Sequence, residues 1–286
     1  MGMKLSATVA ALASTLVLAS GAAAITNGQP DGSAHSNVGA VYVTAPNFGG
    51  TFIVCSGTLV APGVLLTAAH CLLAPPDPTV RFSVSFAPSI DQNNIDPASL
   101  IPAKPVMDPQ FQNCDCPDPH DIGVLLFDPA AAARIKPVKL PKLGVLDKLV
   151  AKRQKKDAHD AIHSRVGKPG HRYGNGNSDK KLKFGHGDFV DVGYGITDIN
   201  AWDPGTRRAT ASGDSVLDDN FLTLSQDVSR GFGGTCIIDS GGPQFVGDVQ
   251  VSMTEGGDET CSQVGVNLRL DTPTVQAFLA PFGVRF

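Results

Sequence analysis

The sequence predicts an all-β fold of the barrel or sandwich type. The 286 residues include 31 Gly and 21 Pro but only 6% aromatic residues, a composition that favours short strands and many turns over a helical bundle. Short apolar and β-branched runs recur between turns, and none of them keeps a 3.6-residue periodicity. A chain of this length with 42% hydrophobic residues can bury one large core or two medium ones.

Strands are expected wherever β-branched and apolar residues dominate between turn residues. Alternation of Phe82, Val84 and Phe86 predicts a strand with one buried face, and the continuous apolar run 122–127 predicts a strand buried on both faces. Pro273 predicts the start of a short terminal helix. The expected strands cover 38–43, 51–60, 64–69, 81–86, 122–127, 189–195, 221–224, 245–253 and 264–270, and the helix covers 274–279.

Residues 1–24 are typical of a secretory signal peptide. Lys4 supplies the initial charge, and the apolar run Leu5–Leu18 is too short to span a bilayer comfortably. Ala22–Ala24 supplies the small residues that a signal peptidase requires. No later segment approaches the ~20 apolar residues of a membrane span. We therefore expect a secreted, extracellular protein in which the six cysteines can form disulfides.

Residues 151–188, the basic segment, differ in composition from the rest of the chain. They hold ten Lys and Arg against four Asp and Glu, in a protein with net charge −4. A solvated loop is the expected structure. The alternative is a docking site for a polyanion or acidic partner. His159 and His163 are spaced i, i+4, but no third ligand accompanies them, so no metal site is expected.

Three short motifs contain the residue types of nucleophilic catalysis. His70 follows an apolar run, Asp121 precedes another, and Ser240 lies in the motif Asp-Ser-Gly-Gly-Pro. A Ser hydroxyl needs a base to attack at neutral pH, and the ordinary pKa of His suits that task. A buried carboxylate can fix the His tautomer. Each residue alone fits a turn or a core position, but together they predict a nucleophile, its base and an orienting acid.

In the order T-A-A-H-C, D-I-G-V-L-L and D-S-G-G-P, the sequence resembles the trypsin/chymotrypsin-like serine peptidases, in particular secreted bacterial-type members. The resemblance covers the mature chain except the basic segment. It implies two six-stranded antiparallel β-barrels of the chymotrypsin type with a short C-terminal helix. The barrel at 25–140 would carry His70 and Asp121, and the barrel at 141–286 would carry Ser240. It also implies polypeptide substrates, no cofactor and no metal.

The resemblance implies two structural disulfides, Cys55–Cys71 and Cys236–Cys261. The other two cysteines, Cys114 and Cys116, have no counterpart in the family. A bridge between them would close a tight, strained ring. A local Cys114–Cys116 bridge and two free or intermolecular thiols are both open.

The resemblance also implies an activation switch and an oxyanion hole. A newly formed α-amino group on Ile25 would pair with buried Asp239, and signal peptidase cleavage after Ala24 would create it directly. The backbone N–H groups of Ile238 and Ser240 would bind the oxyanion. The family usually has Gly where this chain has Ile238, and a β-branched residue resists unusual backbone angles. If Ile238 crowds the substrate, its replacement by Gly is expected to raise turnover on esters.

Substrate-binding residues also follow from the resemblance. Gly234 would lie at the base of the specificity pocket with Thr235 beside it, so no fixed anion awaits Lys or Arg. Ser252 and Thr254 would lie on the strand that pairs with the substrate backbone, with Gly265 on the opposite wall. A Thr in the wall would narrow the pocket. Cleavage after a small or medium uncharged side chain is therefore expected.

The function expected from the sequence is serine endopeptidase activity through an acyl-enzyme on Ser240. The alternative is a catalytically weak or inactive homologue that acts as a binding protein, because Ile238 departs from the family pattern. A lipase or esterase is disfavoured, since the Gly-x-Ser-x-Gly elbow and the Ser-Asp-His order are absent. The sequence does not fix an oligomeric state, and a monomer is expected.

Overall fold

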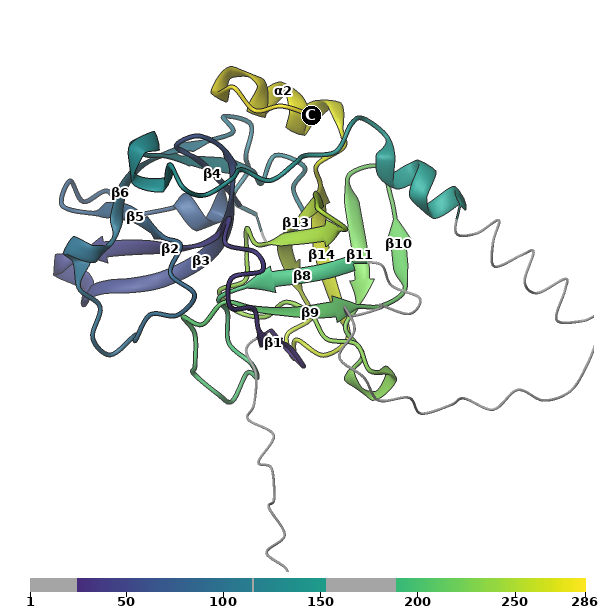
Figure 1. Ribbon diagram of the computed structural model, residues 1–286, viewed down its shortest axis with the longest axis horizontal. Coiled ribbons are helices and arrows are strands. Elements are labelled where there is room, and N and C mark those ends of the chain that lie inside the picture. The colour runs from purple at the N-terminus through teal and green to yellow at the C-terminus, as the bar shows by residue number, and fades with distance from the viewer. Residues whose placement is uncertain (1–24, 115, 153–188) are drawn as a thin grey trace, which may run out of the picture.

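Residues 25–114, 116–152 and 189–286 are described by a computed structural model of the protein (Figure 1). The strands of the first half, purple to blue, lie beside those of the second half, green to yellow. The expected signal peptide and nearly all of the basic segment, with His159 and His163, lie outside the described residues. No helix in the described part of the chain is long and apolar enough to cross a membrane.

The first half forms a closed antiparallel barrel. Its strands follow the order β2-β3-β4-β7-β6-β5 around the barrel. Closure leaves no free strand edge, which favours a stable small barrel. The strands are β2 (Val38–Ala45), β3 (Gly50–Ala61), β4 (Val64–Thr67), β5 (Arg81–Ser85), β6 (Ile101–Met107) and β7 (Gly123–Leu126).

The second half, together with β1 from the start of the chain, forms one eight-stranded sheet in the order β1-β9-β8-β12-β13-β14-β11-β10. Short β1 and β10 lie at its two ends. The helix α2 (Pro273–Leu279) follows β14, with Thr272 capping its N-terminus. The strands are β1 (Gln29–Pro30), β8 (Phe189–Gly193), β9 (Arg208–Ser212), β10 (Ser215–Leu217), β11 (Phe221–Ser225), β12 (Pro243–Val246), β13 (Val249–Gly257) and β14 (Val264–Arg269).

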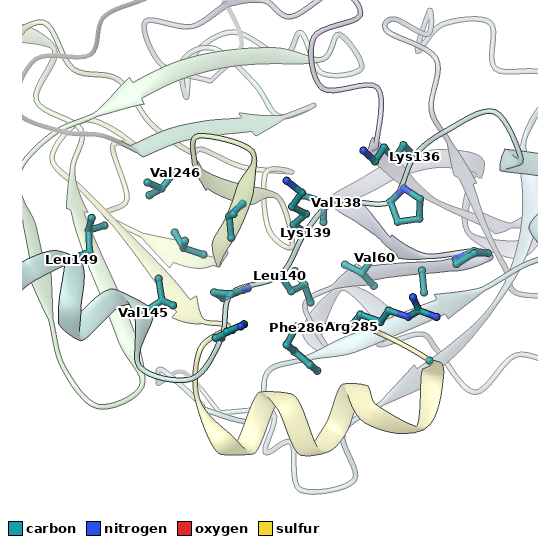
Figure 2. Close-up of a pocket in the computed structure, with 18 residues that line it drawn as sticks. Val60, Lys136, Val138, Lys139, Leu140, Val145, Leu149, Val246, Arg285 and Phe286 are labelled. Atoms are coloured by element: carbon teal, nitrogen blue, oxygen red, sulfur yellow. The ribbon is translucent and has the colours of Figure 1, made fainter.

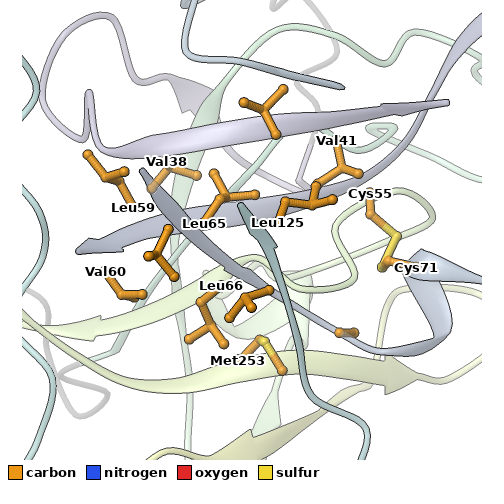
Figure 3. Packing of buried hydrophobic residues seen from close by; sticks show 14 of the residues in the cluster. Val38, Val41, Cys55, Leu59, Val60, Leu65, Leu66, Cys71, Leu125 and Met253 are labelled. Carbon is orange, nitrogen blue, oxygen red and sulfur yellow. A yellow bond between two sulfur atoms is a disulfide. The ribbon is translucent and has the colours of Figure 1, made fainter. Parts of the chain in front are cut away.

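One hydrophobic core continues through both halves. Leu65, Leu66 and Leu125 fill the barrel, and Met253 of β13 belongs to the same cluster (Figure 3). Val275 of α2 is also buried in it. This shared core stabilises the arrangement of the two halves, on which a site between them depends. The all-β, chymotrypsin-type prediction with a short C-terminal helix is confirmed.

Two local predictions need correction. The expected single strand 245–253 is a hairpin, because β12 ends at Val246 and Gly247 (φ +62°) turns the chain into β13. β1, β6, β9 and β10 were not expected from the sequence; in β6, Pro102 and Pro105 argue against a strand. β6 pairs with β5 through its first residues and with β7 through its last ones. Each proline therefore lies in only one of the two ladders.

Candidate active site

The His70–Asp121 pair lies where two neighbouring strands end. Thr67 of β4 and Gly123 of β7 are register partners, which brings the following helix η2 (His70–Leu72) beside Asp121. Asp121 Oδ1 accepts a hydrogen bond from the His70 backbone N–H (2.8 Å), and Oδ2 lies 2.6 Å from His70 Nδ1. An ionised carboxylate only accepts, so Nδ1 is the donor and Nε2 is left as proton acceptor. Asp121 is buried, whereas the His70 side chain is 33% exposed.

Ser240 is placed beside this pair by the Cys55–Cys71 disulfide. The Ser240 carbonyl accepts from the Ser56 N–H (2.9 Å) and lies 3.7 Å from Cys71 Sγ. A His70 ring nitrogen and both sulfurs of the bridge lie within 4.8 Å of one another. In the part of the chain that the structure describes, the Ser240 hydroxyl makes no hydrogen bond to His70. Such bonds are often long without substrate, so the arrangement is compatible with a nucleophile and its base.

Ile238 adopts the left-handed conformation, with φ +77°. This conformation suits Gly and costs an L-residue roughly 1–2 kcal/mol. The Ile238 side chain is buried in the core, and its carbonyl accepts from Ser56 Oγ (3.1 Å). Within the described ranges, neither the Ile238 nor the Ser240 backbone N–H donates a hydrogen bond to another residue. Two donors are thus available for an oxyanion beside Ser240.

Asp239 is completely buried next to the nucleophile motif. Its Oδ1 accepts from the Gly195 N–H (2.8 Å) and its Oδ2 from the Cys236 N–H (2.9 Å). Gly193 and Gly195 pack so closely on the carboxyl that a Cβ on either would clash with it. Burial raises the pKa of the Asp239 carboxyl to about 7. Among the described residues, no cation forms an ion pair with Asp239.

Ile25 is completely buried and has φ +56°. The next residue, Thr26, exchanges backbone hydrogen bonds with Gly234 (2.9 and 3.2 Å). The first residues of the expected mature chain are therefore fixed against the segment that precedes the nucleophile. The predicted ion pair with Asp239 requires a free α-amino group on Ile25, and in this uncut chain the Ile25 nitrogen is a peptide nitrogen, so the pair stays a prediction.

A buried glutamine, Gln226, fills the space between the predicted pocket residues. Its amide, oriented to satisfy both groups, accepts from the Thr235 N–H (2.9 Å) and donates to the Thr235 carbonyl (3.2 Å). A Cβ on Gly234 or Gly265 would lie 2.2–2.5 Å from Gln226 side-chain atoms. The side-chain faces of these two glycines are thus covered by an uncharged amide. Sequence reasoning missed Gln226, for which only a polar residue after an apolar strand gave a hint.

Ser252 and Thr254 lie in the interior and do not line a cleft. Both are buried, and their side chains hydrogen-bond Gln244. The Thr254 backbone is already paired, because its N–H donates to Gly242 and its carbonyl accepts from Gly241 (both 2.8 Å). The expectation that this segment pairs with substrate is therefore corrected. The strand continues past a bulge to its partly exposed end at Glu255–Gly257.

Gly257 is the residue of β13 that faces Gly265 across the sheet. Glu255, in the same strand, interacts electrostatically with His70 and Asp121. Sequence reasoning assigned it no role. The two consecutive glycines before Cys261 were the sequence feature that could have indicated this register. The end of β13, and not Ser252–Thr254, is positioned to pair with an extended peptide.

Both predicted disulfides, Cys55–Cys71 and Cys236–Cys261, are present, and a third bridge joins Cys114 to Cys116. The first ties Cys71, the residue after His70, to β3, and its sulfur lies against the Ser240 carbonyl. The second connects the segment before Ser240 to the end of the loop after β13. The third resolves the alternative left open by the sequence in favour of a local bridge.

A separate pocket of about 1010 Å³ contains none of these residues (Figure 2). Val60 contributes from the barrel, Val246 from the second sheet and Phe286 from the C-terminus. Its labelled side chains are mainly aliphatic, with exposed Lys136, Lys139 and Arg285. Apart from its exposed lysines, the residues that line it include no His, Asp, Glu, Ser or Cys.

Comparison with known proteins agrees with this arrangement. A search of curated proteins finds no match to the chain. The sequence model of the family described as Trypsin matches residues 25–274, which is most of the chain and includes both halves of the fold. The chain therefore belongs to the trypsin family of serine peptidases.

Proposed function

We propose that this protein is a secreted serine endopeptidase that acts through an acyl-enzyme on Ser240. The observation that carries the proposal is the contact by which the buried Asp121 carboxylate orients His70, close to the Ser240 segment. The unbonded backbone N–H groups of Ile238 and Ser240 support it. The Trypsin family match supports polypeptides as substrates. The disulfides are compatible with an oxidising, extracellular location and with removal of residues 1–24.

The mechanism follows from the roles of these groups. His70 Nε2 removes the Ser240 proton as Oγ attacks the substrate carbonyl, and Asp121 stabilises the resulting imidazolium. The Ile238 and Ser240 N–H groups bind the oxyanion of the tetrahedral intermediate. His70 then protonates the leaving amine, and the acyl-enzyme remains. Water, deprotonated by His70, releases the acid in a second, equivalent half-reaction.

Active-site labelling tests the proposal directly. The mature protein is treated with a fluorophosphonate, and the modified peptide is identified by mass spectrometry. We expect one adduct on Ser240, formed more slowly after substitution of His70 by Ala. Failure to label a folded protein with intact disulfides would reject catalysis and favour the second candidate function. That candidate, a binding protein with a catalytically weak site, is suggested by the left-handed Ile238.

Ile238→Gly is not expected to raise turnover, in contrast to the expectation from sequence. The Ile238 side chain packs into the core and does not project into the cleft, so removing it frees no space for substrate. Relief of roughly 1–2 kcal/mol of backbone strain is opposed by loss of about 1.5–3 kcal/mol of burial. We expect a slightly lower melting temperature and unchanged or lower ester kcat. Ile237→Gly, at an exposed neighbour, is the matched control; a tenfold gain in kcat for Ile238→Gly would contradict this.

Gln226→Ala is expected to deepen the specificity pocket. Wild type should prefer a small or medium uncharged residue before the cut, because the Gln226 amide covers Gly234 and Gly265. Truncation removes that floor, so kcat/KM for Leu or Phe relative to Ala should rise on the order of 10-fold or more. A fluorogenic substrate panel measures the ratio, with exposed Gln263→Ala as control. An unchanged ratio, or best cleavage of an Arg substrate by wild type, would refute the assignment.

A polyanion or acidic partner for the basic segment is retained as a proposal from sequence alone. Its residues beyond 152 lie outside the described structure. We also propose processing at Ala24–Ile25, activation through Asp239 and a monomeric state.

A further inference from the structure

Glu255 extends from the second half of the molecule to the loop that carries Asp121. It follows Thr254 at the bulge of β13, where the register with β14 shifts. Its Oε1 accepts a hydrogen bond from the Asp118 backbone N–H (3.1 Å). The Asp118 carbonyl in turn accepts from the Asp121 N–H (2.9 Å). The Glu255 carboxyl therefore connects β13, through the turn Asp118–Asp121, to the Asp121 side chain that orients His70.

Several hydrogen bonds connect the described residues of the loop held by Glu255. The Asp118 carboxylate accepts from the N–H groups of Gln112 (2.6 Å) and His120 (2.9 Å). The His120 ring contacts buried Asp108 (3.0 Å). Because these bonds lie within the first half, the position of the loop relative to the other half depends on contacts that cross between the halves. Glu255 makes such a contact directly beside the catalytic groups.

Two acidic side chains and one basic side chain interact electrostatically with Glu255. Asp118 and Asp121 face it from the loop before β7, and His70 faces it from η2. Burial is the main cause that raises the pKa of the Glu255 carboxyl to about 7, with smaller contributions from the two Asp carboxylates. The Asp118 N–H and His70 act in the opposite direction. Glu255 therefore ionises as pH rises through the range in which a histidine base operates.

We propose that Glu255 is a positioning residue of the His70–Asp121 pair: it holds the Asp121 loop against β13, and its negative charge favours the imidazolium form of His70. The effect of Glu255 on catalysis rests on the proposed function. Its effect on the protonation of His70 does not. Protonation of Glu255 removes its negative charge and therefore weakens the attraction for a proton on His70. The same charge stabilises the imidazolium that forms in the transition state.

Glu255→Gln separates the effect of the negative charge at residue 255 from the effect of its hydrogen bond to Asp118. The Gln oxygen can still accept from Asp118 N–H, so the contact between the halves is preserved while the charge is lost. We expect the acidic limb of the kcat/KM profile to move to lower pH by on the order of half a unit, with a lower plateau. Glu255→Ala should lose both the charge and the contact and should have the lower plateau of the two. Glu259→Gln, an exposed carboxylate in the same loop, is the matched control and should leave the profile unchanged.

The titration of the His70 ring provides a readout that does not require activity. Its imidazole C–H resonance, assigned by loss in His70→Ala, is followed by NMR against pH in wild type and both Gln variants. We expect a lower midpoint pH in Glu255→Gln than in wild type and Glu259→Gln. If the protein proves inactive but this midpoint moves, the proposed function fails and the coupling stands. An unmoved midpoint and acidic limb in folded Glu255→Gln would overturn the inference.

Discussion

Ser240→Ala is expected to reduce kcat by about 10⁶-fold, the size of loss seen when another Ser-His-Asp peptidase loses its nucleophile. The hydroxyl is the only group of the site that can form the acyl-enzyme, and neither His70 nor the free N–H groups replace it. Residual turnover should reflect substrate binding and the oxyanion donors alone. Hydrolysis of a peptide ester under single-turnover conditions, together with loss of the fluorophosphonate adduct, measures the effect.

The controls for this variant test whether the three residues act as a unit. Ser99→Ala, the same substitution at an exposed position, should retain wild-type turnover. The double variant of Ser240 and His70 should be no less active than Ser240→Ala, because residues of one catalytic unit are not additive. Substantial activity in folded Ser240→Ala, inhibited by the same reagents, would contradict the assigned nucleophile. It would leave the fold and the family membership unaffected.

The residues of this site differ in how far the sequence could predict them. His70, Asp121 and Ser240 each stand in a local motif whose meaning depends on few neighbours, so the sequence alone was enough to propose them. The barrel brings His70 and Asp121 together by pairing β4 with β7; the apolar runs predicted these two strands but not their pairing. By contrast, Gln226 is a single polar residue whose role depends on two glycines far along the chain. Only the register of β11 with β14 places it there.

The substrate-binding strand shows a second limit of prediction from sequence. The resemblance to the family assigns substrate pairing to Ser252–Thr254, but this segment lies within the β12–β13 hairpin, which the sequence predicted as one strand. The bulge after Thr254 then shifts the facing residues again. Hairpins and bulges change which residue faces the cleft without changing composition. Gly247-Asp248 was the sequence signal for this turn, and the φ of +62° at Gly247 agrees with it.

Retention of residues before Ile25 is expected to lower kcat/KM on the order of 10²-fold or more, the cost of a defective oxyanion hole. In the uncut chain the Ile25 nitrogen is a peptide nitrogen and cannot supply a cation to Asp239. Signal peptidase cleavage after Ala24 would create that cation. N-terminal sequencing of the secreted protein should therefore give Ile25 first, and a start at Ala23 or earlier would contradict the proposal. Turnover of this form is compared with that of a chain extended by one uncleaved Ala.

Asp239→Asn distinguishes activation from other effects of the extension. In the processed chain it should reproduce the loss caused by the extension, because the new amino group then lacks its anionic partner. In the extended chain it should have little further effect on turnover. Equal activity of processed and extended wild-type chains would exclude a role for the Ile25 amino group.

The pH dependence of stability gives an independent test of the same switch. In the uncut chain the Asp239 carboxyl has its pKa raised to about 7 by burial, whereas an unfolded Asp ionises near its ordinary value of 3.8. Between those two values the folded chain binds more protons than the unfolded one, so stability is greatest at low pH. It then falls as pH rises, by about 1.4 kcal/mol per pH unit across this window. Buried Asp191, whose pKa is also raised to about 7, adds a dependence of the same sign, and its charge acts on Asp239.

An α-amino group paired with Asp239 removes the contribution of Asp239 itself. The melting temperature of the extended chain should therefore fall more between pH 5 and pH 7 than that of the processed chain, and Asp239→Asn should abolish the difference.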